Sequence, residues 1–407
     1  MRGGFPDLIS RGLLLGALAA TAAACGTARN GRTDQDLGIG QEAATPFTVP
    51  PGLYDQTRPD DLGLRSPAGA ETVSVFRPSA ASDHFSNGVV LVGFQGWLYA
   101  QWQSSAQDED APDTWVAYSR SQDGKSWSAP MTLAERWDQG TRTSGGWWVA
   151  GDTLVAYVNV WPAATVPRGG YTEYATSTDG LVWSARRRLP MADGTPMNAI
   201  FEQDPHALPD GRIVGAAHFQ PGLQAAPCFT DDPSGQGGWT RARLPNLAHA
   251  GEVTRELEPS WFRRADGVLV MVFRDQSSSN RRLAATSADR GASWSAPVLT
   301  GMPDSRSKQS AGNLPDGTAY QVGNPVSSNL RVPLVVTLSR DGQVFDKALV
   351  LRRGGAELPA LRYPGRAKRA GYSYPKSMVW QGSLYVGYST NKEDVEYTRV
   401  PVTALGY

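Results

Sequence analysis

The chain has 407 residues, of which 40% are hydrophobic and 19% are charged, so it can bury a large globular core. Lysine and arginine together number 39, as do aspartate and glutamate, and this balance argues against binding of nucleic acid through phosphate charge. Two cysteines are too few for a disulfide framework, and we expect Cys228 to be a small buried side chain.

The first 24 residues are typical of a secretory signal. Arg2 and Arg11 precede a short apolar run from Gly12 to Leu18, and small residues follow it up to residue 24. This run is shorter than the roughly 20 residues that a membrane-spanning helix needs. The sequence therefore predicts export.

Cys25 directly follows these small residues, as the acylated cysteine does in a bacterial lipobox, although Ala22 stands where that pattern usually has leucine. Lipidation of Cys25 and simple cleavage are both open. Residues 25–70 are polar and contain Gly and Pro, so we expect a flexible lead, which would tether an acylated protein to a membrane. The predicted location is secreted or anchored to the cell envelope.

Two sequence markers recur through the rest of the chain. A glycine turn followed by a strand-like stretch is found at Gly96, Gly151, Gly211, Gly267, Gly317 and Gly382. A Ser-x-Asp start with a glycine and a closing aromatic residue is found at 121–127, 177–183, 287–294 and 339–345, with a degraded copy at 230–239. In such a hairpin turn, Asp accepts backbone N–H groups, Gly takes a positive φ and the aromatic ring covers neighbouring strands.

Each repeat is long enough for four strands of five to six residues with their turns. The sixth repeat ends after three strands, whereas an additional strand-like segment, residues 72–78, precedes the first repeat. Pairing this segment with the last strand would complete the sixth sheet and remove exposed edges. We therefore predict an all-β fold, a six-bladed β-propeller over residues 71–407 that is closed by an N-terminal strand.

The second marker resembles the Asp-box of sialidases, whose superfamily also has six blades, and the resemblance covers nearly all of residues 70–404. In a four-stranded blade, the Asp-box turn and the glycine turn lie on one face. The starts of the inner strands and the loops between the second and third strands therefore lie on the opposite face. We expect these segments to line a central pocket.

The resemblance implies roles for residues of the fourth and fifth repeats. In ELEPSW, Glu258 is similar to the glutamate that activates the nucleophile, and Arg274 to one of three arginines that clamp the substrate carboxylate. In NLRVPL, Arg331 is a candidate for a second clamp arginine. A planar guanidinium suits a carboxylate because it donates two parallel hydrogen bonds. The alternative for Arg274 is a surface ion pair with Asp275.

In the sixth repeat, GYSYPKS resembles the inner-strand segment that bears the tyrosine nucleophile of sialidases, and it matches at Tyr372 or Tyr374. A phenol can attack an anionic sugar without bringing a bare carboxylate up to it. Ordinary packing within the blade is the alternative for either tyrosine.

In the first repeat, the loop SSAQDEDAPDT lies where sialidases keep an aspartate general acid. Its carboxylates belong to Asp108, Glu109, Asp110 and Asp113, and the distance to the following Asp-box favours Asp110. A cluster of like charges raises a carboxyl pKa, as a general acid requires near neutral pH. A solvated acidic loop is the alternative.

The first repeat also departs from the sialidase pattern. Sialidases open this blade with Phe-Arg-Ile-Pro, whereas residues 76–78 read Phe-Arg-Pro and lie too early in the chain. Arg77 is the candidate for the third clamp arginine, but on a closing strand it would leave the clamp incomplete. The pocket position is then expected at His84, Ser86 or Asn87.

This departure favours a second resemblance, to propeller enzymes that act on rhamnose–glucuronate linkages and to polysaccharide lyases, which place a catalytic histidine near the opening of an early blade. The resemblance implies a His or Tyr that removes the proton alpha to a uronate carboxylate or protonates the leaving oxygen. The candidates are His84, His206 and His218, of which His206 is predicted to face the pocket. A structural histidine is the alternative for each.

These patterns predict an exported, monomeric glycosidase that cleaves a terminal acidic sugar from glycans. The alternatives are a lyase for uronate-containing polysaccharides and a non-catalytic carbohydrate-binding propeller. We expect no cofactor, because the sequence has no HExxH motif, no CxxC pair and no phosphate-binding loop between a strand and a helix. Calcium bound by loop aspartates is left open.

Overall fold

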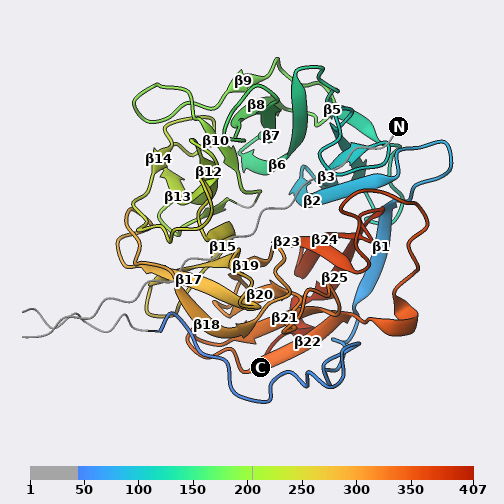
Figure 1. Cartoon of the computed structure of the whole chain (residues 1–407), viewed down its shortest axis with the longest axis vertical. Coiled ribbons are helices and arrows are strands. Elements are labelled where there is room, and N and C mark those ends of the chain that lie inside the picture. Colours follow the sequence, from blue (N-terminus) through green and yellow to red (C-terminus); the bar gives the residue numbers. More distant parts are fainter. Residues whose placement is uncertain (1–44, 204) are drawn as a thin grey trace, which may run out of the picture. The chain divides into compact units, whose positions relative to one another are not determined.

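The computed structural model describes residues 45–203 and 205–407, and these form six antiparallel sheets arranged as the blades of a β-propeller (Figure 1). The first blade consists of β2 (Phe85–Phe94), β3 (Trp97–Ser105), β4 (Trp115–Ser121) and β5 (Met131–Ala134), and the second of β6 (Gly140–Ala150), β7 (Thr153–Pro162), β8 (Tyr171–Ser177) and β9 (Arg187–Arg188). The third consists of β10 (Ala199–Phe201), β11 (His206–Ala207), β12 (Ile213–Phe219), β13 (Gln224–Thr230) and β14 (Thr240–Arg241), and the fourth of β15 (Glu256–Arg263), β16 (Leu269–Asp275), β17 (Arg281–Ser287) and β18 (Val298–Pro303). The fifth consists of β19 (Ser310–Asn313), β20 (Ala319–Gly323), β21 (Leu334–Ser339) and β22 (Lys347–Arg352), and the sixth of β23 (Tyr372–Trp380), β24 (Ser383–Thr390), β25 (Asp394–Pro401) and β1 (Glu71–Phe76). Short 3-10 helices are present at η1 (Gly355–Glu357) and η2 (Val402–Ala404).

The sixth blade closes the propeller as the sequence predicts. Strand β1 pairs antiparallel with β25, and the register places Thr72 opposite Thr398. The N-terminal strand thus covers the outer edge of the last sheet, which would otherwise present unpaired backbone groups.

The Asp-box turns have the hydrogen bonds expected of them. In the second blade, Oδ1 of Asp179 accepts the Ser177 hydroxyl at 2.9 Å and the backbone N–H groups of Leu181 and Val182 at 2.8 and 2.9 Å. Equivalent bonds are made by Asp123, Asp289 and Asp341. All four turns connect the third and fourth strands of their blades.

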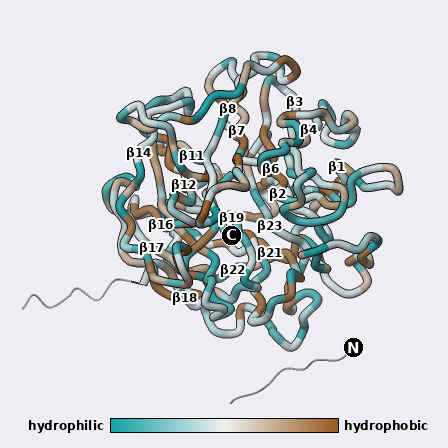
Figure 2. Tube along the Cα trace, turned by 45° about the horizontal axis from the view of Figure 1, so that its top comes forward, coloured by the Kyte–Doolittle hydropathy of each residue, from teal (hydrophilic) through white to brown (hydrophobic). Residues whose placement is uncertain are grey.

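The core consists of six hydrophobic clusters, each of which lies between two neighbouring blades. The aromatic residue that closes each Asp-box belongs to this packing. The ring of Trp183 lies 5.8 Å from that of Tyr118 in the preceding blade, and the ring of Phe345 lies 5.2 Å from that of Phe262. Cys228 is fully buried between the second and third blades, which confirms the prediction. Figure 2 shows hydrophobic residues along strands such as β7, whereas many peripheral loops are hydrophilic.

The expectation of a flexible lead over residues 25–70 is corrected for its second half. Phe47, Tyr54 and Leu62 are buried in the cluster between the fourth and fifth blades. The hydroxyl of Tyr54 is also hydrogen-bonded to Thr337 at 2.7 Å. Residues 45–70 are therefore anchored, because their apolar side chains pack against residues of both blades in this cluster. The predicted signal and Cys25 lie outside the described residues.

Within the described ranges, no helix has the length and apolar character needed to cross a bilayer.

Candidate active site

Three inner strands carry the same irregularity at the end where the site is expected. In β2, β15 and β23 the pairing with the second strand skips two residues, and the first skipped residue is Gly88, Glu258 or Tyr374. These residues have φ values of 64°, 53° and 54°. A left-handed backbone costs a non-glycine residue about 1–2 kcal/mol, and the bulge turns its side chain out of the regular pleat. Glu258 and Tyr374 are therefore strained residues at equivalent places in two blades.

These bulges border a polar cavity of about 290 Å³ on the propeller axis. Its wall includes Tyr374, Glu258 and Glu202 at the openings of three blades, Lys308 just before β19, and Asp110 in the loop between β3 and β4. The cavity therefore lies at the starts of the inner strands, as the order of strands predicts.

Four cationic side chains gather around Tyr374. The guanidinium carbon of Arg331 lies 4.7 Å from the centre of the phenol ring, and the amines of Lys392 and Lys308 lie 5.3 and 5.8 Å from it. The guanidinium of Arg274 is close enough to Tyr374 for the phenol to interact with its charge. Such positive charge favours an anionic ligand beside the phenol.

Tyr372, the other tyrosine of this segment, has a structural environment. Its side chain is fully buried, its hydroxyl donates to the backbone carbonyl of Arg353 at 2.7 Å, and its ring packs against Tyr388. Of the two tyrosines, only Tyr374 reaches the cavity.

Glu258 and Arg274 form an ion pair of 3.1 Å at the cavity wall. Burial alone would raise the pKa of Glu258, but the charges of Arg274 and Lys308 outweigh it and hold that pKa below its usual value. The alternative partner for Arg274, Asp275, binds Arg255 instead at 2.8 Å. Arg274 and Glu258 are thus brought together with Tyr374, although the sequence separates them widely.

Arg331 lies behind the Tyr374 ring. Its side chain is only 3% exposed, and it donates to the Ser373 hydroxyl at 2.8 Å. Its Nε has no hydrogen-bond partner among the described residues. The phenol covers the guanidinium, so Arg331 is close to the site without forming the wall of the cavity.

A second buried network, between the third and fifth blades, adjoins Glu258. His218 Nδ1 lies 3.2 Å from a carboxylate oxygen of Glu202, and the other oxygen of Glu202 lies 2.8 Å from Lys308 Nζ. Burial opposes ionisation of Glu202, but Lys308 and the His218 hydrogen bond outweigh it and lower the pKa of Glu202. The charges of Glu202 and Glu258 likewise overcome burial and raise the pKa of Lys308.

The acidic loop of the first blade reaches the cavity with two carboxylates. Asp110 forms a bidentate pair with Arg168, with distances of 2.7 and 2.9 Å. Glu109 lies 2.6 Å from Lys392 and accepts a hydrogen bond of 3.2 Å from Asn87. Asn87, one of the three residues expected at the pocket opening of this blade, lines the cavity and is 2% exposed.

Two predicted residues lie away from the cavity. Arg77 follows the closing strand, is largely exposed and lies 3.6 Å from Asp394. His84 stacks on the ring of Tyr363 with a separation of 3.8 Å, and its Nε2 lies 3.1 Å from the carbonyl oxygen of Ser79. Neither residue is among those that line the polar cavity.

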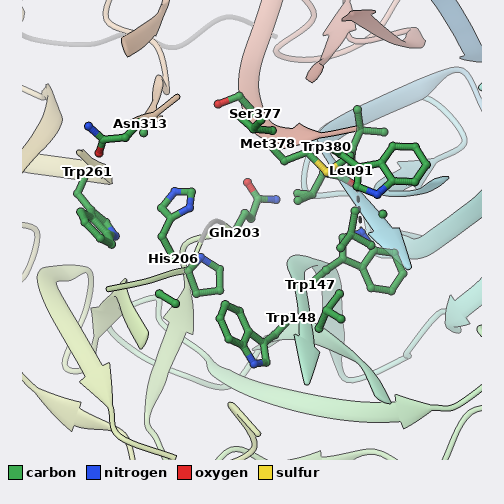
Figure 3. A pocket seen from close by; sticks show the side chains of 18 of the residues that line it. Leu91, Trp147, Trp148, Gln203, His206, Trp261, Asn313, Ser377, Met378 and Trp380 are labelled. Atoms are coloured by element: carbon green, nitrogen blue, oxygen red, sulfur yellow. Dashed lines mark hydrogen bonds between the residues drawn. The ribbon is translucent and has the colours of Figure 1, made fainter. Parts of the chain in front are cut away.

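His206 faces a different cavity, which corrects the expectation that it faces the same pocket as Glu258. It belongs to β11, which follows the interruption of the inner strand and lies nearer to its other end. There it lines a second axial cavity of about 580 Å³ with Trp147, Trp148, Trp261 and Trp380 (Figure 3). The indole N–H groups of Trp147, Trp148 and Trp261 donate to backbone carbonyls, which fixes these rings.

Gln203 lies between the two cavities and lines both. Its side-chain amide donates to the hydroxyl of Ser144 at 2.6 Å and accepts from Lys308 at 2.9 Å. Among the described residues, no group of three His, Cys, Asp or Glu side chains is placed to hold a metal ion.

Sequence reasoning missed Glu202, Lys308 and Lys392 as residues of the site. A signal exists for Glu202, because it lies just before an Asp-Pro step at the opening of the third inner strand, as Glu258 and Tyr374 directly precede prolines in theirs. Lys308 and Lys392 lie in connecting segments with no such marker.

Comparison with known proteins supports the fold assignment. Solved structures that are similar include a sialidase, with a TM-score of 0.62 and 19% identity over 88% of this chain and 35% of that chain. The Hadza microbial sialidase Hz136 has a TM-score of 0.60 and 16% identity, over 78% of this chain and 65% of that one. A protein of unknown function from Dyadobacter fermentans has a TM-score of 0.61 and 16% identity, over 82% of this chain and 99% of that one.

This chain spans about a third of the length of the first of these sialidases. A comparison with curated proteins gives no significant match. A family model described as the BNR repeat-like domain matches residues 96–386. That match spans most of the six blades described above, and the chain therefore belongs to the BNR repeat-like domain family.

Proposed function

We propose that the chain is a glycoside hydrolase that removes a terminal acidic sugar, of the sialic acid or uronate type, from glycans. The observation that carries the proposal is the convergence of Tyr374 and Glu258 at one polar cavity, with Arg274 paired to Glu258 beside it. Export, and a membrane tether at Cys25 if it is acylated, remain part of the proposal.

Tyr374 is the proposed nucleophile. Its phenol oxygen attacks the anomeric carbon, the glycosidic oxygen leaves with a proton, and water later releases the sugar from the enzyme. Glu258 is ion-paired to Arg274 beside the phenol, and its carboxylate must approach the phenol oxygen to accept the proton directly, because a guanidinium stays protonated and does not relay it. An ionised Glu258 suits this role, because only the carboxylate can accept a proton.

One cation beside Tyr374, Arg331, has no carboxylate among the described residues to offset its charge, and this favours an anionic substrate. Four of the basic residues at this end of the axis are paired with carboxylates, Arg168 with Asp110, Arg274 with Glu258, Lys308 with Glu202 and Lys392 with Glu109. Arg331 has an acidic partner in none of the ion pairs of the described residues, and it adds positive charge behind the phenol. Asp110 is the proposed general acid, which requires Arg168 to release it when substrate binds.

The test is an assay of the protein against fluorogenic glycosides of N-acetylneuraminate, glucuronate and galacturonate. We expect turnover of at least one, and loss of about 10³-fold or more in kcat for Tyr374→Phe. Tyr372→Phe is the matched control, because its hydroxyl contacts only a backbone carbonyl outside the cavity. It should keep kcat within about threefold of the wild type.

Turnover of none of these glycosides by the folded protein would contradict the proposal. An unsaturated product that absorbs in the ultraviolet would instead identify a lyase. Binding without any chemical change would identify a carbohydrate-binding propeller.

A further inference from the structure

The strained peptide group of Glu258 has unusual support. Because the bulge removes Glu258 from the ladder between β15 and β16, its backbone N–H needs another acceptor. That acceptor is Nε2 of His218 on β12 of the neighbouring blade, at 3.1 Å. On the other side, the carbonyl of Glu258 accepts from the Gln309 side chain at 2.8 Å.

The arrangement fixes the proton of the imidazole. A ring nitrogen that accepts the Glu258 N–H carries no proton, so in neutral His218 the proton lies on Nδ1. Nδ1 faces the carboxylate of Glu202 at 3.2 Å, and that carboxylate is held by Lys308 at 2.8 Å. Both polar atoms of the His218 ring are thus engaged by the protein, and its side chain is 4% exposed.

The equivalent position of the first blade supports this interpretation. There the left-handed residue is Gly88, which takes a φ of 64° without the steric cost that a side chain imposes. Glu258 carries a side chain in the same conformation, so other contacts must hold it.

We propose that His218 is a positioning residue that keeps Glu258 in its left-handed conformation, and that Glu202 and Lys308 hold the imidazole in the tautomer this requires. The inference rests on the proposed function of Glu258. His218 acts through Glu258 and does not itself exchange protons with the substrate, because both ring nitrogens are engaged by Glu258 and Glu202.

One experiment compares two substitutions of His218 on a glycoside that the wild type turns over. In His218→Gln, the amide oxygen can accept the Glu258 N–H while the amide nitrogen donates to Glu202. In His218→Leu, both bonds are lost. We expect His218→Leu to lower kcat by roughly 10²-fold with little change in KM, and His218→Gln to restore most of it.

The matched control is His249→Leu, since His249 is exposed and outside the cavity. It should keep wild-type kinetics. Equal activity of His218→Leu and the wild type would overturn the proposal, as would a His218→Gln variant no better than His218→Leu.

A second measurement does not depend on turnover or on the folding of a variant. Nitrogen-15 NMR of the wild-type imidazoles at pH 8 should show His218 as the neutral tautomer with the proton on Nδ1. A proton on Nε2 would overturn the proposal. If the wild type turns over no glycoside while the NMR shows the expected tautomer, the proposed function fails and the positioning of Glu258 stands.

Discussion

The two axial cavities differ in chemistry although five of the blades contribute inner-strand residues to both. The polar cavity is lined by Glu202, Glu258 and Lys308, whereas the described residues around the second cavity include four tryptophans and no carboxylate. Figure 3 shows these rings around the hollow, with Gln203 between them. The position along a strand, and not the blade, therefore decides which chemistry a residue serves.

Backbone geometry explains this difference. At the opening of the strands, bulges turn single side chains toward the axis and leave peptide groups that need polar partners. Beyond the bulges the strands regain the regular pleat, whose alternating side chains pack between blades or border the second cavity.

The largest expected change in stability comes from removing a charge of the polar cavity. Glu202→Gln leaves the buried amine of Lys308 without its carboxylate partner, which should lower the free energy of unfolding at pH 7 by about 3–5 kcal/mol. The folded-state pKa of Glu202 lies below its unfolded value. The stability that this carboxylate contributes is therefore present above pH ~4.5 and is lost as pH falls toward the folded-state pKa.

Urea denaturation between pH 3 and pH 8 measures this effect. The difference in free energy of unfolding between the wild type and Glu202→Gln should become smaller as the pH falls below about 4.5. Trp148→Phe in the second cavity is the control, and its effect should stay constant with pH. If the difference in free energy of unfolding between the wild type and Glu202→Gln did not change with pH, the polar cavity would not differ from the second cavity in its electrostatic contribution to stability.

A smaller effect is expected at the boundary between the cavities. A Cβ at Gly88 would lie 2.8 Å from Ser144 Oγ and 2.9 Å from Gln203 Nε2, whereas a Cβ at Gly96 would have nothing within 4 Å. Both glycines have positive φ, at 64° and 78°, so the backbone strain of alanine is similar. Gly88→Ala should therefore lower the free energy of unfolding by about 1–2 kcal/mol more than Gly96→Ala does. Thermal or urea unfolding measures the difference. Equal costs would mean that Gln203 and Ser144 can move aside.

The smallest effect is expected at the rim of the polar cavity. Arg168 and Asp110 are paired at 2.7 Å, but their side chains are 56% and 41% exposed. Arg168→Gln should change the free energy of unfolding by less than about 1 kcal/mol, and added salt should weaken even that. A loss comparable to that of Glu202→Gln would contradict the contrast between exposed and buried pairs.

Much of the fold could be predicted because its signals are local. Ser177, Asp179 and Gly180 build a turn from neighbouring residues, and the same pattern repeats along the chain. The strand at residues 72–78 was predictable by elimination, since the last blade lacked one strand. The anchoring of residues 45–70 was not predictable, because it depends on side chains of two blades that come together only in the folded protein.

The site was predictable where a local sequence pattern identifies a residue. Glu258 and Tyr374 stand before prolines at the opening of inner strands, and the structure brings both to one cavity. Arg77 also stands before a proline, but it follows the closing strand β1 and does not open an inner strand. The structure places Arg77, His84 and His206 outside the polar cavity.

The sequence by itself determined the repeats, the turns and the closure of the propeller, because these follow from contacts between residues near one another or from a simple count of strands. Only the tertiary structure decided the partners of the charged groups. Glu202, His218, Lys308 and Glu258 come from three blades, and whether they form one network depends on strand register and bulges that no local pattern encodes.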